Sequence, residues 1–347
     1  MTTAGAWAPV LEGYLAALGA GDRGAALGLV QSLYADGHDV LTIVTEVLAP
    51  AQRRVGEEWV RDAWSVAQEH AATAISEAAV HRLAAARDAD ASADAPTGAP
   101  LVVVSCVEQE WHALPALIVA EHLRDAGLAV SYLGANASAQ HLVRHIHDVG
   151  PRAVLLSCSL SGFLPLARRQ VEAVRETGTP VVVGGAAFDA AGRRAEVLGA
   201  TAYAGSAAEA AAVVGVLPPA VGAAEPLSHP GADEAYVVFG DREALADEVE
   251  RMLFQALAAT RAAPITADDR SWLRVLDDQM PHLVGAVAGA LVTGDGRVVA
   301  EALDWAELVL AHRDAPAEVG PALRRALHVA MHDVPVAATM LAGMQSG

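Results

Sequence analysis

Residues 6–85 carry their apolar side chains at the spacing of helices that each bury one face. Short turns rich in glycine and aspartate separate these segments. Pro50 is a candidate kink in the third helix, and Ser65 is a candidate N-cap of the fourth. The pattern predicts a four-helix bundle over residues 1–88. Its helices are expected near 10–18, 27–34, 40–59 and 65–87.

From residue 100 the pattern changes to short continuous apolar runs, which are typical of strands buried on both faces. A linker of small and polar residues, 88–99, precedes the change. The runs alternate with helical segments, so the sequence predicts a doubly wound parallel sheet, a Rossmann-like domain over residues 100–216. Strands are expected near 101–106, 128–133, 153–158, 180–183 and 201–204, and helices near 113–126, 138–149, 163–177 and 189–198.

The last part of the chain, residues 234–347, has a helical pattern throughout and follows a proline-containing linker at 217–233. It is expected to form an all-helical domain. The run Tyr236–Phe239 leaves open a short strand at its start. Helices are expected near 241–261, 267–292, 296–313, 316–332 and 334–344.

Charge and composition narrow the possible functions. The chain has 347 residues, a net charge of −19 and no lysine. A nucleic-acid-binding face needs clustered positive charge, so direct DNA binding is not expected, and Schiff-base chemistry on lysine is excluded. With no apolar run long enough for a membrane span and no signal-peptide pattern, a cytoplasmic protein is the expectation. Cys106 and Cys158 fall at buried strand ends, which indicates reduced thiols.

Ligands of doubly wound sheets bind outside the carboxyl ends of the strands. The candidate binding residues at these ends have side chains or backbone suited to a cofactor. They are Glu110, Trp111, His112, Gly134, Ala135, Ser157, Ser159, Leu160, Gly184 and Gly185. Serine supplies hydrogen bonds, and glycine leaves room for a long buried ligand tail.

Within this set, His112 is the candidate metal ligand. A neutral imidazole on a loop can bind a metal, and Glu110 is placed to hold its other ring nitrogen and raise its basicity. The alternative is an ordinary surface histidine, which a lone Glu-x-His would favour. The serine and glycine loops at the neighbouring strand ends favour the ligand interpretation.

Residues 100–212 resemble the cobalamin-binding domain of corrinoid-dependent methyltransferases, mutases and light sensors. The matching motifs are Glu110-x-His112, Ser157-x-Ser159 with Leu160, and Gly184-Gly185. The resemblance implies that His112 is the lower axial cobalt ligand, with the dimethylbenzimidazole tail buried between sheet and helices. Pro115 replaces the last glycine of the first family motif, which puts the local path of the tail in question.

A second motif lies upstream: Trp59, nine residues, then Glu69-His70. It resembles the signature of adenosylcobalamin-dependent photoreceptors of the CarH type. That resemblance implies that Trp59 packs over the adenosyl group and that His70 can become the upper cobalt ligand after light breaks the Co–C bond. The alternatives are a bundle-core tryptophan and a solvated Glu-His pair. Trp64 and Trp111 are either walls of the upper pocket or core residues.

The expected function is therefore a light sensor rather than an enzyme, binding adenosylcobalamin. CarH-type proteins begin with a DNA-binding helix-turn-helix domain, whereas here the bundle starts almost at Met1 and the extra domain is C-terminal. The alternative is a corrinoid carrier for a methyltransferase, which would share the fold through residue 212 but would not require a tryptophan cap. A homo-oligomer or a signalling partner is expected.

The order of domains resembles the photocobilins, in which a C-terminal domain binds a bilin, and the helical pattern faintly resembles globin-like sensor domains. The resemblance implies biliverdin, bound non-covalently because the domain lacks cysteine; haem is the alternative. Trp272 and Trp305 are expected in the core. The candidate partners of a chromophore are Arg270, Arg297, Arg324, Arg325, Asp277, Asp278, His282, His312, His328 and His332, each of which can also be an ordinary surface residue.

Overall fold

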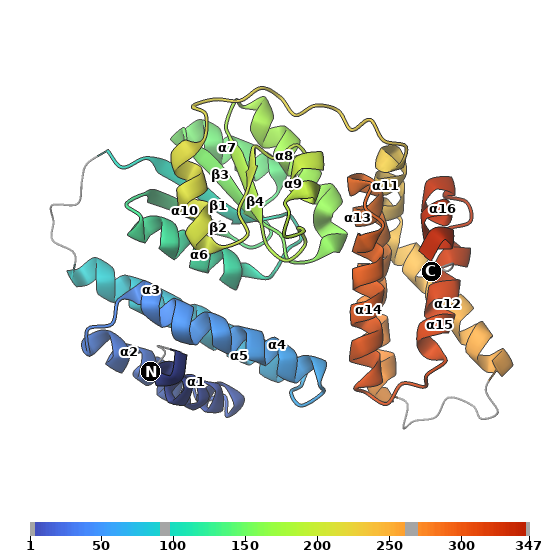
Figure 1. The fold of residues 1–347 in the computed structure, drawn as a ribbon, viewed down its shortest axis with the longest axis horizontal. Coiled ribbons are helices and arrows are strands. Elements are labelled where there is room, and N and C mark those ends of the chain that lie inside the picture. The colour runs from blue at the N-terminus through green and yellow to red at the C-terminus, as the bar shows by residue number, and fades with distance from the viewer. Residues whose placement is uncertain (1–3, 91–97, 261–269, 345–347) are drawn as a thin grey trace.

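The structure is a computed structural model that describes residues 4–90, 98–260 and 270–344. It contains a helix bundle, a parallel sheet flanked by helices, and a C-terminal group of helices (Figure 1). The bundle lies against one side of the sheet domain, and the C-terminal helices stand at the end of both. The predicted fold class is confirmed.

The bundle has four helical segments. Three of them begin where the sequence supplies a cap: the Asp22 and Asp39 carboxylates accept backbone N–H bonds, and Ser65 and Gln68 form a reciprocal capping box. The third segment contains a π-helical turn just before Pro50, at the place where the proline ring would clash with the preceding turn. The elements are α1 (Ala4–Gly19), α2 (Arg23–Ala35), α3 (Val40–Ile43), η1 (Val44–Leu48), α4 (Ala49–Val60) and α5 (Val66–Asp90).

The sheet has five parallel strands in the order β2-β1-β3-β4-β5. The strand order reverses between β1 and β3, which is where doubly wound sheets bind ligands. The strands are β1 (Leu101–Cys106), β2 (Ala129–Gly134), β3 (Ala153–Ser157), β4 (Val181–Gly184) and β5 (Ala202–Tyr203). Cys106 and Cys158 are buried and unpaired, and burial raises the pKa of the Cys106 thiol to about 12.

Helices cover both faces of the sheet. On one face α6 (Ala113–Asp125) packs over β1, β2 and β3, and α10 (Ala207–Val216) packs over β4 and β5. Helix α6 also contributes Leu114 and Leu117 to the core of the bundle. On the other face lie α7 (Ala139–Val149), η2 (Ser161–Phe163), α8 (Leu164–Glu176) and α9 (Arg193–Val197). The sequence did not predict α10, and α9 is shorter than the helix expected at 189–198.

The C-terminal domain is helical throughout its described residues, as predicted. The strand considered at Tyr236–Phe239 is wrong, because this run lies inside α11 (Gly231–Gly240). Ala235, Val238 and Phe239 are buried there at helical spacing, whereas Val237 is exposed. The other helices are α12 (Arg242–Thr260), α13 (Arg270–Thr293), α14 (Arg297–Ala311), α15 (Val319–Ala330) and α16 (Pro335–Met344).

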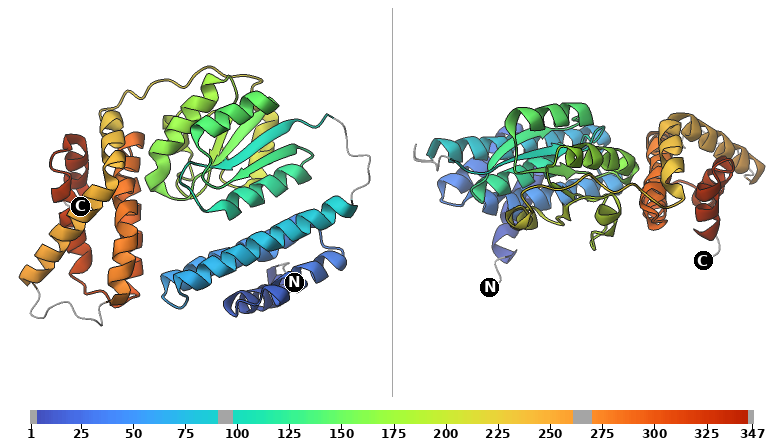
Figure 2. Two further views of the ribbon diagram at one scale, coloured as in Figure 1. Left: turned by 180° about the vertical axis from the view of Figure 1, so that it is seen from behind. Right: turned by 90° about the horizontal axis from the view of Figure 1, so that it is seen from above.

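The C-terminal domain and the sheet domain share one hydrophobic core, which runs from β3 and α8 into α11–α16. Two views in Figure 2 show α13 beside the sheet domain. The contact needs glycine: a Cβ on Gly289 would lie 2.3 Å from the Ser161 carbonyl oxygen, and one on Gly285 would lie 3.1 Å from the Gly162 Cα. Helix α13 therefore packs directly against the η2 backbone.

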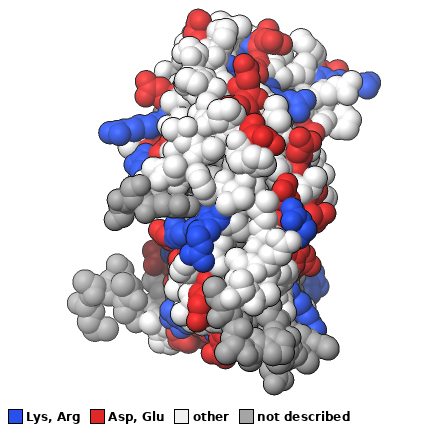
Figure 3. All heavy atoms as spheres, turned by 90° about the vertical axis from the view of Figure 1, so that its right-hand side faces the viewer, with Lys and Arg blue, Asp and Glu red and all other residues white. Residues whose placement is uncertain are grey.

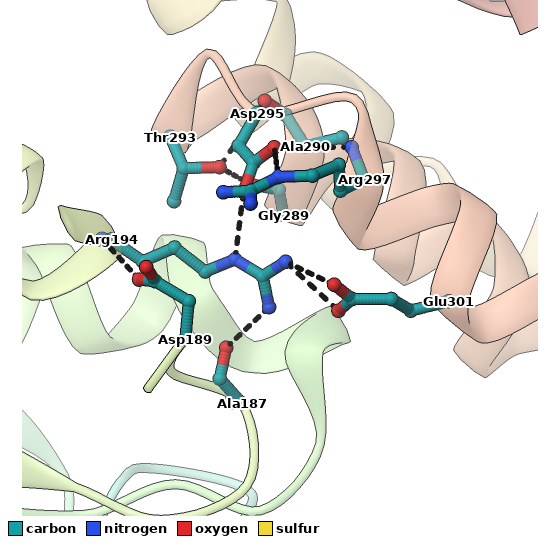
Figure 4. A network of polar contacts seen from close by, with 9 residues as sticks. All are labelled: Ala187, Asp189, Arg194, Gly289, Ala290, Thr293, Asp295, Arg297 and Glu301. Atoms are coloured by element: carbon teal, nitrogen blue, oxygen red, sulfur yellow. Dashed lines mark hydrogen bonds and ion pairs between the residues drawn. The ribbon is translucent and has the colours of Figure 1, made fainter. Parts of the chain in front are cut away.

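A buried arginine reinforces this contact (Figure 4). The Arg194 guanidinium, from α9, lies 3.0 Å from the Asp295 carboxylate and 2.8 Å from that of Glu301. It also donates to the Ala187 carbonyl. Hydrogen bonds from Arg297 and Arg194 lower the pKa of Asp295 to about 2. None of the helices in the described ranges is long and apolar enough to cross a membrane.

Candidate functional site

The loop after β1 and the loop after β3 meet at one buried carboxylate, that of Glu110. Its Oε1 accepts from the His112 backbone N–H at 3.0 Å and lies 2.5 Å from His112 Nδ1. Its Oε2 accepts from the backbone N–H groups of Ser159 and Leu160 at 2.7 and 3.0 Å. Glu110 thus joins the two predicted motifs, and it leaves His112 Nε2 free to bind a ligand.

The charges of this pair follow from these contacts. The hydrogen bond to Glu110 raises the pKa of His112 against the effect of burial, and the nearby Glu69 carboxylate adds to the rise. Burial works to raise the pKa of Glu110, but the bonds from His112 and Leu160 outweigh it and lower that pKa. The pair is a carboxylate–imidazole unit of the kind that orients a metal-binding histidine.

The loop after β2 supports the same edge. Gly134 ends the strand with φ +76° beside an irregularity in the β1–β2 pairing, and Ala135 follows it. The next residue, Asn136, donates its backbone N–H to the Glu110 carbonyl and accepts from the Gln109 N–H through its side chain. The structure therefore places Gly134 and Ala135 beside the Glu110 loop.

Gly184 and Gly185 are required by close backbone contacts at the end of β4. A Cβ on Gly184 would lie 2.6 Å from the Ala204 carbonyl oxygen, and one on Gly185 would lie 2.3 Å from that of Cys158. Gly185 also has φ +106°. Both glycines line a cavity, so they serve packing and ligand space together.

That cavity has a volume of about 380 Å³ and runs between the sheet and helices α6 and α10, starting one turn after His112. Ser157 lines it, and so does Gln52 from α4. Gln52 Oε1 is buried without a hydrogen-bond partner among the described residues, so it is free to accept from an amide-bearing ligand. A mostly apolar slot with an unsatisfied acceptor at its rim fits the predicted cobalamin tail.

Pro115 also lines this cavity and does not close it. It stands in the first turn of α6, where backbone N–H groups have no partner within the helix. The proline therefore costs no helical hydrogen bond.

Across the site, α5 presents a second histidine held by a carboxylate. The Glu69 Oε2 atom lies 2.6 Å from His70 Nδ1, and the His70 side chain is 75% exposed. Glu69 is fixed in turn by the Thr73 hydroxyl at 2.9 Å, and Thr73 accepts from Gln52 Nε2 at 2.6 Å. The sequence interpretation missed Gln52 and Thr73; the spacing of four residues between Glu69 and Thr73 on one helix was the available signal.

The three tryptophans that the sequence suggested for the upper pocket have different surroundings. Trp59 stacks on Trp305 of the C-terminal domain, with ring centroids 5.5 Å apart. Trp64 packs in the bundle core beside Gly19, whereas Trp111 is 71% exposed and lines a second cavity. Trp305 was expected in the core, and that prediction is wrong: it is 39% exposed, because it covers Trp59 rather than facing inward. Trp272 is buried, as predicted.

The candidate chromophore partners of the C-terminal domain are spread over its surface. Asp277, Asp278, Arg325, His312 and His332 are exposed. Arg297 pairs with Asp295, and Arg324 pairs with Asp304 and Glu307. His328 is half-buried with no described partner for Nδ1, and the Arg270 side chain lies outside the described residues.

Among the described candidates, His282 lies near the Glu110–His112 pair. It lines the second cavity, of about 260 Å³, together with Trp111, Phe163 and Arg242. Burial lowers the pKa of His282, and the positive charge of His112 lowers it further. The predicted chromophore partners whose side chains are described therefore do not come together in one site.

Two family models match this chain, one over the helix bundle and one over the sheet domain. Residues 100–215 match the B12 binding domain, and residues 10–84 match a second B12 binding domain model. The HTH-type transcriptional repressor CarH of Myxococcus xanthus is 32% identical over 153 residues, which cover 41% of this chain and 46% of CarH. The chain thus matches less than half the length of this curated relative.

A solved structure shows the same fold. The monomethylamine corrinoid protein of Methanosarcina barkeri superimposes with a TM-score of 0.50 at 19% identity, over 59% of this chain and 97% of that protein. Residues 10–84 and 100–215 are therefore B12-binding domains, and together they form a cobalamin-binding, CarH-like core.

Proposed function

We propose that this protein is a light sensor that binds adenosylcobalamin between the helix bundle and the sheet domain. One observation carries the proposal: two histidines from different domains, His70 and His112, are each held at Nδ1 by a carboxylate, and neither Nε2 has a hydrogen-bond partner among the described residues. A carrier needs only the lower of these pairs. The similarity to CarH supports the same choice.

In this proposal His112 would hold the cobalt of the cofactor, and Glu110 would fix the tautomer and orientation of its imidazole. The slot lined by Ser157, Gly184 and Gly185 holds the nucleotide tail. Adenosylcobalamin supplies a cobalt–carbon bond that visible light cleaves. His70 would then be available as a second cobalt-binding histidine. Its partner Glu69 is linked through Thr73 to Gln52, so a movement of His70 would be passed to α4.

The output of the sensor would come from the C-terminal domain. On the side drawn in Figure 3, described arginines are interspersed with carboxylates rather than gathered into one basic face. A partner signalling protein or a second copy of the chain is the proposed recipient. Biliverdin bound without a covalent link stays a prediction for this domain, and haem is its alternative.

The alternative function is a corrinoid carrier for a methyltransferase, which the fold of the Methanosarcina protein favours. A carrier exposes the upper face of its corrinoid to an enzyme. It would therefore bind methylcobalamin and adenosylcobalamin with similar affinity, and it would not need His70.

The test is the absorption spectrum of the protein loaded with adenosylcobalamin, before and after green light. We expect a light-dependent change that ends in a bis-histidine spectrum, and His70→Ala should abolish that end state. His81→Ala, on the same helix and exposed, is the matched control. No retained adenosylcobalamin, or a spectrum that light leaves unchanged, contradicts the sensor.

A further inference from the structure

The C-terminal end of α4 is a strained turn that carries Trp59. The Ala63 N–H donates to the Glu58 carbonyl at 2.9 Å and that of Asp62 to the Trp59 carbonyl at 3.0 Å. This ending places Asp62 in the left-handed region, with φ +61°, where glycine is the usual residue. The turn alone would favour glycine, so we expect the Asp62 side chain to make a stabilising contact.

Arg313, just after the end of α14, makes that contact with Asp62. Its side chain is buried, and its guanidinium donates to the carbonyls of Trp59 and Val60 at 2.7 and 3.2 Å. The last carbonyls of a helix lack partners within the helix and carry partial negative charge, so a cation from another domain stabilises this helix end. Asp62 completes the contact with an ion pair at 3.4 Å.

The same arginine also contacts the indole of Trp59. The guanidinium carbon lies 4.9 Å from the ring centroid, and the Trp305 ring stacks on Trp59 with an angle of 19° between the planes. Burial lowers the pKa of Arg313 against the effect of Asp62, yet a guanidinium keeps its charge in proteins. Backbone and side chain of Trp59 are thus both held by the C-terminal domain.

We propose that Arg313 and Trp305 are positioning residues for Trp59, and that the C-terminal domain thereby sets the upper face of the cobalamin site. The inference rests on the proposed function, because the place of Trp59 matters to cobalamin only if this residue lies over the upper ligand. Trp305 and Arg313 would then control how tightly the site holds an adenosyl group.

The first test compares the affinity of the full chain for adenosylcobalamin and for hydroxocobalamin in the dark. Arg313→Met and Trp305→Ala should each lower the affinity for adenosylcobalamin, relative to that for hydroxocobalamin, by about tenfold. This is the effect of losing one desolvated cation–π or stacking contact. The affinity for hydroxocobalamin, which has no adenosyl group, should stay as it is. A merely structural role would weaken both affinities alike, and Arg313→Lys should recover part of the ratio.

Asp62→Gly is the mild variant of the same test. It removes the carboxylate that faces Arg313 but relieves the positive φ, so it keeps the fold while loosening the contact. A smaller fall in the ratio is expected. If the unsubstituted protein binds adenosylcobalamin and responds to light while all variants keep its ratio, the inference is wrong and the sensor stands. If it binds no adenosylcobalamin, both fail.

A second test needs no cofactor. In a double-mutant cycle on the unloaded protein, Trp59→Phe and Trp305→Phe should shift the urea midpoint by less together than the sum of their separate shifts. Trp7→Phe, in α1 against His38, is the control partner for Trp305→Phe and should add fully. Full additivity of the Trp59 and Trp305 changes overturns the inference.

Discussion

A single buried carboxylate, that of Glu110, organises the lower side of the site. It accepts four hydrogen bonds from two loops and from one imidazole. Removing its charge would leave His112 free to rotate and would leave two loop N–H groups less well bonded. The geometry of the site therefore depends more on Glu110 than on any neighbour that contacts the ligand directly.

We predict that Glu110→Gln lowers the affinity for hydroxocobalamin by about 10- to 100-fold, the usual effect of losing a carboxylate behind a metal-binding histidine. Equilibrium dialysis measures the loss, and circular dichroism checks that the variant is folded. Glu108→Gln changes the same loop two residues away and should bind normally. Unchanged affinity in Glu110→Gln would show that His112 needs no orienting partner.

Part of this site could be predicted from the sequence, because Glu110 and His112 are close in the chain and the ends of parallel strands meet at one edge. The partners of Trp59 could not. Trp305 and Arg313 lie far along the chain, and each has an ordinary place in an amphipathic helix pattern. The sequence also offered no sign that Asp62 adopts a left-handed conformation for the sake of Arg313.

Among the elements, α13 shows how closely the C-terminal domain is joined to the sheet domain. Its Gly285 and Gly289 lie one turn apart and let the helix approach the η2 backbone. Glycine is unfavourable inside a helix, so these positions give up helix stability for contact. The tight packing fixes α13 beside the loop that bonds to Glu110.

We predict that Gly289→Ala destabilises the protein by about 1–3 kcal/mol, although alanine favours the helix by about 1 kcal/mol, because the new methyl group would overlap the Ser161 carbonyl. Urea unfolding measures this change. Gly215→Ala, in α10 with open space around it, is the control and should raise the stability slightly. A stabilised Gly289→Ala protein would contradict the close packing.

Some helices could be predicted from the sequence more easily than others. Helices with one apolar face, such as α7 and α15, have a clear period. The helix α10 was missed because its alanines and valines are apolar on every side and hide the period. Tyr236–Phe239 resembled a strand because its residues favour strands locally, and burial against α13 decided for helix.

At the scale of the whole molecule, Arg194 is the charged link between the sheet domain and the C-terminal domain. It bonds to Asp295 and Glu301 across the boundary and, through its backbone N–H, to Asp189 on its own side. The pKa of Asp295 is lowered to about 2. A carboxyl group whose pKa is lower in the folded state stabilises the fold above its ordinary pKa and loses that effect as the pH falls.

We predict that Asp295→Asn lowers the unfolding free energy by on the order of 2 kcal/mol at pH 6. The difference from the unsubstituted protein should shrink as the pH falls from about 4 to about 2, since Asp295 is protonated first in the unfolded state and then also in the folded state. Asp304→Asn, at an exposed position of α14, should change the unfolding free energy by at most about 0.5 kcal/mol. A difference that does not depend on pH would contradict the assigned pKa.

The hydrophobic core common to the sheet domain and α11–α16 bears on how such a chain can diversify. Domains joined only by a linker can be exchanged between proteins by recombination, because no interface between them has to be matched by further substitutions. Here an exchanged C-terminal domain would need its own match to η2, to the buried Arg194 and to the end of α4. The residues at these three junctions should therefore be inherited as a set, and a change of output should arise by substitution within the domain more readily than by its replacement.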